Sequence, residues 1–307
     1  MLDSVAFVFP GQGSQAVGMG VDLGAEFPVA RALFEEADDA LGFPLSRIIR
    51  EGPAEALTLT ANTQPAILLV SVATYRALDL EPAAVAGHSL GEYSALVAAG
   101  ALAFGDAVRL VHQRGRYMQE AVPAGEGAML ALIGLEADAI RAAIAADGGA
   151  VDIANDNAPG QIVIAGEREA ARRVAAAAAG ARQAIELPVS APFHCRLMRP
   201  AEERLRADLA TVAIGVPRIP FYNNVDAARV TDAEAIRDGL ARQVSRTVRW
   251  TELVRTMIAD QRIATIAEVG PGNVLTGLTR RIDRAIERVT VNDAPSLAAA
   301  RTRFASA

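Results

Sequence analysis

The chain has 307 residues, of which 51% are hydrophobic and 5% aromatic, and its formal net charge is −6. This length predicts one large domain with an insertion, or two domains, and the composition argues against intrinsic disorder. The acidic balance argues against a nucleic-acid binder, and the apolar runs are too short for a membrane span or a secretory signal, so we expect a cytoplasmic protein without a membrane partner.

The sequence contains no lysine and one cysteine. All 30 basic residues are arginine, so chemistry that needs a lysine, such as a Schiff base, a pyridoxal phosphate anchor or a P-loop, is excluded. The single cysteine, Cys195, leaves no internal disulfide and no cysteine-built metal site. We expect Cys195 to be a small buried apolar residue, and we expect neither a metal nor an organic cofactor.

A strand is predicted over Leu2–Phe9, and the glycine-rich loop FPGQGSQAVGMG follows it. Gly11, Gly13 and Ala16 fit the dinucleotide-binding spacing G-x-G-x-x-G/A. That fingerprint requires a second strand that ends in an acidic residue about twenty positions later. The acids at that distance lie in RALFEEADDAL, which has a helical pattern. The dinucleotide interpretation therefore fails, and the glycines need another explanation.

The following elements alternate between helix and strand, which predicts a parallel sheet with helices on both faces. Helices are expected over 27–41, 63–78, 90–99 and 104–122, and a short strand over 83–86. The pattern changes after Gly125. From there to Ser190 the order is β-α-β-β-α-β, typical of a ferredoxin-like α+β subdomain. IPFYNNV and TIAEVG read as further strands of the main sheet.

The expected fold is thus α/β, with a large α/β-hydrolase-like domain and an inserted ferredoxin-like subdomain. The large domain is expected to be discontinuous, over residues 1–124 and 191–307, with the insertion over 125–190.

The segment 87–91, GHSLG, has the form G-x-S-x-G and lies between a predicted strand and a predicted helix. In that context Ser89 occupies a sharp turn that exposes its hydroxyl, and the flanking glycines permit close packing. The start of the helix also directs backbone N–H groups toward a developing oxyanion. The alternative is a small-residue turn with an incidental serine, but the context favours a nucleophile.

A serine nucleophile needs a base, and the chain has three histidines: His88, His112 and His194. The tight turn directs His88 away from the serine, and His112 lies in the middle of a helix. His194, in SAPFHCRLM at the exit from the inserted unit, is the best candidate, because such a boundary borders the cleft between two units. No nearby acid is an obvious partner to orient this histidine.

Arg114 falls on the core-facing stripe of the helix over 104–122, together with Val111 and Met118, whereas Arg116 points away. An unpaired buried arginine is costly, so Arg114 should meet an anion. Two explanations stay open: an internal salt bridge, or a guanidinium that binds a substrate carboxylate in the cleft.

Eight segments occur in the order found in malonyl-CoA:acyl carrier protein transacylases, and together they span nearly the whole chain. They are FVFPGQGSQ, GHSLGEYSALVAAGAL, RGRYMQEAVPAGEGAM, NDNAPGQIVIAG, PFHCRLM, NNV, VRW and EVGPGNVLTGL. The chain therefore resembles this family and its polyketide-synthase acyltransferase relatives.

The resemblance implies roles for particular residues. Ser89 would be the acylated nucleophile, His194 its general base, and the backbone carbonyl of Gln243 would orient the histidine. The backbone N–H groups of Gln12 and Leu90 would form the oxyanion hole, which would explain the glycines of the first loop, since they let the backbone approach the cleft.

Further implications concern the acyl group. Arg114 would bind the malonyl carboxylate, and Phe193, next to the histidine, would favour malonyl over methylmalonyl. The implied reaction is a ping-pong transfer of malonyl from malonyl-CoA to the pantetheine thiol of acyl carrier protein, in fatty acid synthesis. A monomer is expected. Because the family's carrier protein is acidic, we expect an arginine patch near the cleft, with Arg196, Arg199, Arg280 and Arg281 as candidates.

Three alternatives remain. The chain could be a free-standing transacylase that serves a polyketide synthase or a malonate decarboxylase. It could be a serine esterase or thioesterase, although those enzymes place an acid and then a histidine after the serine. It could also be a carrier-protein-binding module without catalytic activity, which Ser89 and His194 argue against.

Overall fold

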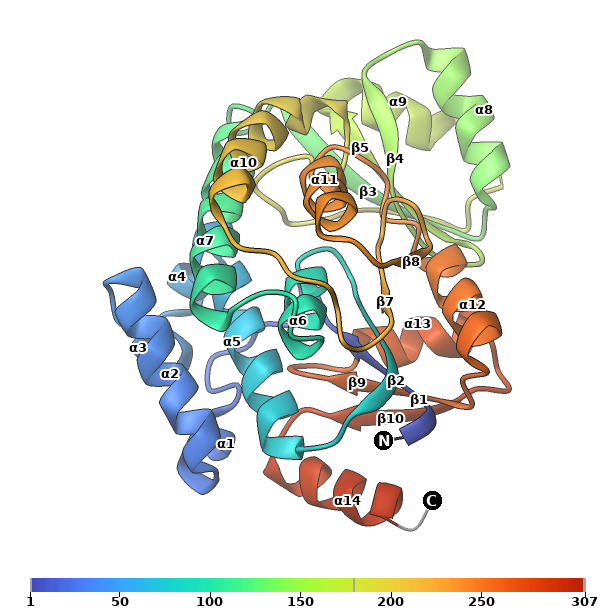
Figure 1. Ribbon diagram of the computed structural model, residues 1–307. Helices are drawn as coiled ribbons and strands as arrows, with labels where there is room; N and C mark the ends of the chain where they lie inside the picture. Colours follow the sequence, from blue (N-terminus) through green and yellow to red (C-terminus); the bar gives the residue numbers. More distant parts are fainter. Residues whose placement is uncertain (1, 179, 306–307) are drawn as a thin grey trace.

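The computed structural model describes residues 2–178 and 180–305. Its main sheet has six strands in the order β10-β9-β1-β2-β7-β8 (Figure 1). The strands are β1 (Leu2–Phe9), β2 (Pro82–Gly87), β7 (Phe221–Tyr222), β8 (Arg229–Val230), β9 (Thr265–Val269) and β10 (Glu287–Val291). Neighbouring strands run parallel except β8, which returns through a turn and pairs antiparallel with β7. The sheet is therefore mixed: its core is parallel, as predicted, and the antiparallel β8 at its edge was not predicted.

Helices fill the connections between these strands. Between β1 and β2 lie α1 (Val21–Glu26), α2 (Pro28–Leu41), α3 (Leu45–Glu51), α4 (Ala54–Thr58) and α5 (Thr60–Leu78). After β2 come α6 (Gly91–Ala98) and α7 (Phe104–Glu120). The later part of the chain contains η1 (Arg196–Met198), α10 (Arg199–Thr211), α11 (Ala233–Gln243), α12 (Trp250–Gln261), α13 (Val274–Ile282) and α14 (Ala294–Ala305). No helix within 2–178 or 180–305 is long and apolar enough to cross a membrane.

The central strand β1 shows how the two faces of the main sheet are covered. Phe7 and Phe9 belong to one buried cluster, which also holds residues of α5, α6 and α14. Ala6 and Val8 point to the opposite face and belong to a second cluster with residues of α12 and α13. All four side chains are completely buried, and burial of each phenylalanine stabilises the fold by about 2–3 kcal/mol. The near-continuous apolar run VAFVF is thus explained by a strand covered on both faces.

A second sheet lies at the far end of the molecule, beside α8 and α9 (Figure 1). Its strands are β3 (Gly127–Ile133), β4 (Val151–Ala158), β5 (Gln161–Glu167) and β6 (Gln183–Glu186), and its helices are α8 (Ala137–Asp147) and α9 (Arg168–Ala177). The strand order is β4-β5-β3-β6, with antiparallel pairing throughout. One face packs against the two helices. Met129 and Val163 lie on the other face and join the core of the main sheet.

Several elements differ from the sequence-based prediction. The sequence analysis missed β10, since an edge strand with exposed charged residues lacks a long apolar run. It also missed α1, α3 and α4, which have only five to seven residues and hence a weak periodic signal. Ala179, in the predicted helical segment REAARRVAAAAAG, lies outside the described residues.

Candidate active site

Ser89 lies in a tight turn between β2 and α6 and has a φ of 51°. This left-handed conformation is rare for a residue with a side chain and is typical of strained functional turns. The turn depends on its glycines. A Cβ on Gly87 would lie 1.9 Å from the Gly91 carbonyl, and a Cβ on Gly91 would lie 2.1 Å from the Phe9 oxygen. The spacing G-x-S-x-G is therefore required by steric contact, as the elbow geometry predicted.

His194 is the histidine that meets this serine. Its Nε2 lies 2.7 Å from Ser89 Oγ, and its Nδ1 lies 2.8 Å from the backbone oxygen of Gln243. A carbonyl oxygen only accepts hydrogen bonds, so Nδ1 carries the proton and Nε2 is free to accept the serine proton. The residue is 4% exposed. Burial, together with the nearby charge of Arg114, lowers the pKa of His194 to about 3, so the imidazole is neutral at physiological pH.

The side chain of Gln243 also contacts the serine turn. Its Nε2 donates to the Ser89 carbonyl oxygen at 2.9 Å and also to the carboxyl group of Glu92. Asn224 accepts a hydrogen bond from the Ser89 backbone N–H at 2.7 Å and donates to the Gly87 carbonyl at 2.7 Å. The elbow is therefore held by side chains that are distant from it in the sequence.

Arg114 is 1% exposed and reaches the serine from α7. Its Nη2 donates to Ser89 Oγ at 3.1 Å and to Gln243 Oε1 at 2.9 Å, and its Nη1 donates to Gln64 Oε1 at 2.7 Å. Its Nε is buried without a partner. In the part of the chain that the structure describes, no carboxylate forms an ion pair with Arg114. The internal salt bridge considered for this residue is thus not found, and the guanidinium keeps its capacity for an anion.

A cavity of about 190 Å³ lies in front of these groups, between the two sheets. Ser89, His194 and Arg114 line it, as do Gln12 and Leu90, whose backbone N–H groups were predicted to bind an oxyanion. Leu90 directly precedes the first turn of α6, where helical N–H groups have no acceptor within the helix.

The first two glycines of the glycine-rich loop, Gly11 and Gly13, are explained by the local backbone geometry. A Cβ on Gly11 would lie 2.6 Å from the His88 backbone oxygen, and Gly13 has a φ of 106°. Close approach to the elbow and a left-handed turn therefore account for the glycines that resemble a dinucleotide fingerprint.

The other candidate residues lie near the cavity or away from it. Phe193 lines the cavity beside the histidine. His88 bonds to Asn157 Oδ1 at 2.7 Å, and His112 bonds to the Ala61 backbone oxygen at 2.8 Å. Neither histidine forms a hydrogen bond to Ser89. Cys195 is fully buried, and burial raises the pKa of its thiol to about 12, so it is an apolar residue as expected.

Three residues of the site were missed by the sequence analysis: Gln64, Glu92 and Asn224. Glu92 is 1% exposed within a helix of otherwise mostly apolar residues, and burial raises the pKa of its carboxyl to about 8. A single acid in the apolar run LGEYSALVAAG, and a glutamine at the start of QPAILLV, were signals that could have found two of them. For Asn224, the segment NNV was noted only for its resemblance.

The four candidate arginines of the expected patch do not form one cluster. Arg196 and Arg199 line a hollow behind His194, where Arg196 is paired with Asp152 at 2.5 Å. Arg281 lines a different hollow, together with Arg182 and Arg284. Arg280 is exposed and lines neither hollow.

Comparison with known families agrees with this geometry. Residues 6–299 match the family model described as the acyl transferase domain. The chain belongs to the acyl transferase family. This acyl transferase is 51% identical over 303 residues to the malonyl CoA-acyl carrier protein transacylase of Escherichia coli K12, and the alignment covers 96% of this chain and 98% of that protein. It is 45% identical over 300 residues to the protein of the same name from Bacillus subtilis 168, covering 95% of this chain and 94% of that one.

Solved structures match the acyl transferase equally well. The acyl carrier protein S-malonyltransferase of Vibrio cholerae has a TM-score of 0.94 and 49% identity, covering 97% of this chain and 99% of that one. A malonyl-transacylase solved in complex with its type II polyketide acyl-carrier protein has a TM-score of 0.94 and 48% identity, covering 98% and 99% of the two chains. The protein is therefore an acyltransferase enzyme with the α/β fold of these structures.

The pKa of His194 gives a prediction for this acyl transferase. Because burial and Arg114 disfavour the charged imidazole, we expect His194 not to titrate between pH 5 and pH 8 in the resting enzyme. Nuclear magnetic resonance of labelled histidine measures this, with assignment from the signal lost in His194→Gln. Arg114→Gln should move the midpoint upward. A His194 midpoint near the ordinary histidine value in the unaltered enzyme would contradict the prediction.

Proposed function

We propose that this acyltransferase transfers the malonyl group of malonyl-CoA to the pantetheine thiol of acyl carrier protein, through a malonyl ester of Ser89. The observation that carries the proposal is the meeting of Ser89, His194 and the buried Arg114, which pairs with no carboxylate of the described residues, in one cavity. The names of its relatives support the choice of malonyl-CoA and acyl carrier protein as the two substrates.

The first half-reaction forms the ester. Ser89 Oγ attacks the thioester carbonyl while His194 Nε2 takes the hydroxyl proton, and the Gln243 carbonyl stabilises the imidazolium through Nδ1–H. The backbone N–H groups of Gln12 and Leu90 donate to the oxyanion. When the tetrahedral intermediate collapses, the C–S bond breaks and His194 returns the proton to the sulfur of coenzyme A.

The second half-reaction repeats these steps with the thiol of the carrier protein. His194 takes the thiol proton, the sulfur attacks the malonyl ester, and the C–O bond to Ser89 breaks as the serine recovers its proton. Arg114 holds the malonyl carboxylate in both steps, with Gln64 fixing the plane of the guanidinium. Phe193 shapes the cavity beside the acyl group. This scheme needs no metal and no bound cofactor.

Initial-rate kinetics with product analysis tests the proposal. The ping-pong scheme predicts parallel double-reciprocal plots when malonyl-CoA is varied at several concentrations of acyl carrier protein, and malonyl-carrier protein as the product. If free malonate were the main product in the presence of the carrier protein, the serine thioesterase alternative would replace the proposal.

The enzyme could supply malonyl groups to fatty acid synthesis or to polyketide synthesis. We place the enzyme in fatty acid synthesis, because the curated relatives at 51% and 45% identity carry the general transacylase name. The polyketide alternative rests on the similarity to a transacylase that was solved with a polyketide carrier protein. Transfer rates to fatty-acid and polyketide carrier proteins, measured side by side, distinguish the two.

We infer that residues 125–190 form a ferredoxin-like subdomain inserted in an α/β-hydrolase-like domain. The strand order β4-β5-β3-β6 with two helices on one face supports the first part, and the serine elbow after β2 supports the second. The boundaries at 124/125 and 190/191, the monomeric state and the cytoplasmic location stay predictions.

For carrier-protein docking we propose Arg281, near the end of α13, with the two arginines beside it. Arg281 lies with Arg182 and Arg284 around a hollow whose lining includes no acid, and Leu278, one turn earlier in α13, lines the cavity. Arg196, by contrast, is neutralised by Asp152. This part of the surface can attract an acidic partner although the whole chain carries a net charge of −6.

Charge reversal tests the docking surface. At low salt, Arg281→Glu is expected to raise the KM for acyl carrier protein about 10-fold and to leave the KM for malonyl-CoA nearly unchanged, because surface charges act mainly on association. The matched control is Arg47→Glu in α3, an exposed position far from α13 (Figure 1). Equal carrier-protein kinetics for the two variants would refute the assignment.

A further inference from the structure

Gln243 and Asn224 both hold the serine elbow, and Gln243 also holds the histidine. The carbonyl of Gln243 accepts from His194 Nδ1 at 2.8 Å, and its side chain donates to the Ser89 carbonyl at 2.9 Å. Asn224 bonds to the backbone on both sides of the elbow, at Ser89 N–H and at the Gly87 oxygen. The position of Ser89 therefore depends on both side chains, and the position of His194 depends on the backbone carbonyl of Gln243.

Gln243 lies at the end of a helix, and Asn224 lies in a turn. Gln243 is the last residue of α11, and a non-helical segment over 244–249 follows it. Asn224 lies in the turn between β7 and β8, two strands of only two residues each, and this turn includes Ala227 with a φ of 52°. The end of a helix and a turn between two short strands need side-chain contacts to stay in place.

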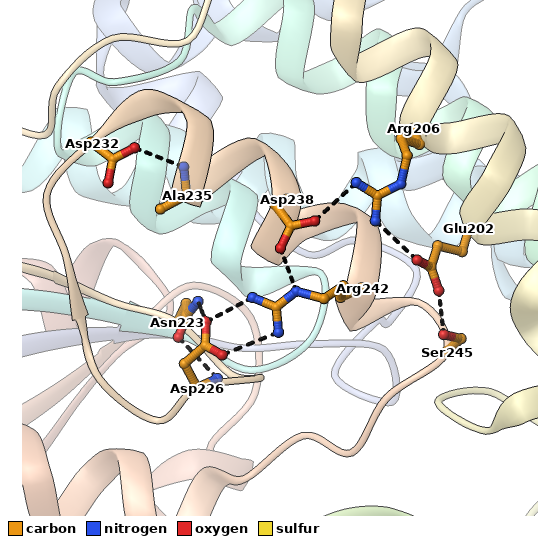
Figure 2. A network of polar contacts seen from close by, with 9 residues as sticks. All are labelled: Glu202, Arg206, Asn223, Asp226, Asp232, Ala235, Asp238, Arg242 and Ser245. Atoms are coloured by element: carbon orange, nitrogen blue, oxygen red, sulfur yellow. Dashed lines mark hydrogen bonds and ion pairs between the residues drawn. The ribbon is translucent and has the colours of Figure 1, made fainter.

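One ion pair joins these two segments directly. The guanidinium of Arg242, the neighbour of Gln243, forms a fork with the Asp226 carboxylate, with distances of 3.1 and 3.0 Å (Figure 2). Asp226 also accepts from Asn223 Nδ2 at 2.8 Å, and its backbone N–H donates to Asn223 Oδ1 at 3.2 Å. The pair thus connects the residue before Gln243 with the turn that carries Asn224.

We propose that this fork, the Arg242–Asp226 clamp, positions Gln243 and Asn224 against Ser89 and His194, and that both clamp residues act on the reaction through them. The proposal rests on the proposed function only in taking Ser89 as the nucleophile and His194 as its base. Neither clamp residue lines the cavity, so they are positioning residues and not catalytic ones.

A second set of contacts ties the clamp to the chain that follows His194. Arg242 Nε donates to Asp238 at 2.5 Å, and Arg206 in α10 bridges Asp238 at 2.9 Å and Glu202 at 3.1 Å (Figure 2). Glu202 in turn accepts from the Ser245 hydroxyl, just after Gln243. Since α10 begins five residues after His194, the network connects both ends of the His194–Gln243 hydrogen bond.

The clamp is a bidentate pair, with two hydrogen bonds in place of one. Its side chains are 31% and 45% exposed, and two parallel hydrogen bonds hold the charges in one geometry. Hydrogen bonds from Arg242 hold the pKa of the Asp226 carboxyl below its usual range. Isolated surface ion pairs contribute little, but a fork within a network is the arrangement that fixes a geometry.

The reactivity of Ser89 tests the clamp, and sulfonylation of this serine does so without any assumption about the acyl substrate. We compare Arg242→Gln, Asp226→Asn and the double variant with the unaltered full chain in two assays. One is the rate of Ser89 modification by phenylmethylsulfonyl fluoride; the other is single-turnover malonylation over a range of malonyl-CoA concentrations. We expect both rates to fall about 10-fold, because a small displacement of the base weakens proton transfer.

Three comparisons distinguish a role in positioning Ser89 and His194 from a role in substrate binding or in protein stability. The malonyl-CoA concentration at half-maximal rate should stay within about twofold, since the carboxylate site is not touched. The loss in the double variant should be smaller than the product of the two single losses, because both single variants break the shared fork. Asp226→Glu keeps the charge and should therefore react faster than Asp226→Asn. This conservative variant also allows the test if one of the other variants does not fold.

Arg237→Gln is the matched control. Arg237 lies on the same helix and fastens it to the Leu209 and Val212 carbonyls, so its loss should lower the melting temperature without changing Ser89 reactivity. Clamp variants with unaltered Ser89 reactivity would overturn the proposal, as would an unaltered chain whose Ser89 is not sulfonylated. If the unaltered chain is sulfonylated but not malonylated, the proposed function fails and the clamp is still tested.

Discussion

Ser89→Ala protein mixed with malonyl-CoA is expected to show no adduct in intact mass spectrometry, whereas the unaltered enzyme gains the mass of one malonyl group. The alanine removes the oxygen that lies 2.7 Å from His194 Nε2, and no other hydroxyl has this partner in the described chain. Transfer activity should fall by on the order of 10⁴-fold or more, as it does when a serine nucleophile is deleted in other enzymes.

A second serine makes a matched control for this experiment. Ser14 lines the same cavity from the glycine-rich loop but lies outside the elbow. Ser14→Ala should keep the malonyl adduct. Persistence of the adduct in Ser89→Ala, with its site mapped elsewhere by peptide sequencing, would show that the elbow serine is not the nucleophile.

Replacement of Arg114 is expected to change acyl selectivity. Arg114→Ala should lower kcat/KM for malonyl transfer by about 10²- to 10³-fold, equivalent to the loss of charge-assisted hydrogen bonds of about 3–4 kcal/mol. Acetyl transfer should change much less, because an acetyl group has no carboxylate for the guanidinium to bind. Rates with malonyl-CoA and acetyl-CoA, measured on the same preparation, give the ratio.

The same helix offers the control for Arg114. Arg116 is two residues away, 47% exposed, and paired with Glu120 at 3.8 Å. Arg116→Ala should leave both acyl groups unaffected. If Arg114→Ala lowered malonyl and acetyl transfer equally, Arg114 would serve to hold Gln64 and Gln243 in place rather than to bind the substrate.

The sequence predicted the elements whose signal is local. The turn around Ser89 could be recognised because steric contact requires glycine at positions 87 and 91, and both positions lie within one five-residue segment. Arg114 could be recognised because it interrupts an apolar stripe, and the structure indeed buries it to 1% exposure. Such features depend on the period of one helix or on one turn.

Features that depend on contacts between distant segments could not be predicted from local patterns. Asn224 lies 135 residues after the serine whose N–H it accepts, and the carbonyl of Gln243 lies 49 residues after the histidine that it orients. A backbone carbonyl has no sequence signature at all, so Gln243 entered only through family resemblance. Likewise, the antiparallel β8 is set by the turn before it and not by an apolar run.

The central claim is that Ser89 carries the malonyl group between two partners. Enzyme malonylated with malonyl-CoA, freed of excess reagent and mixed with holo acyl carrier protein should lose its adduct while the carrier protein gains one malonyl group, both followed by intact mass spectrometry. Our account predicts that the two changes occur at the same rate and in equal amounts. An adduct that stays on the enzyme, or that leaves as free malonate while the carrier protein is unchanged, would contradict it.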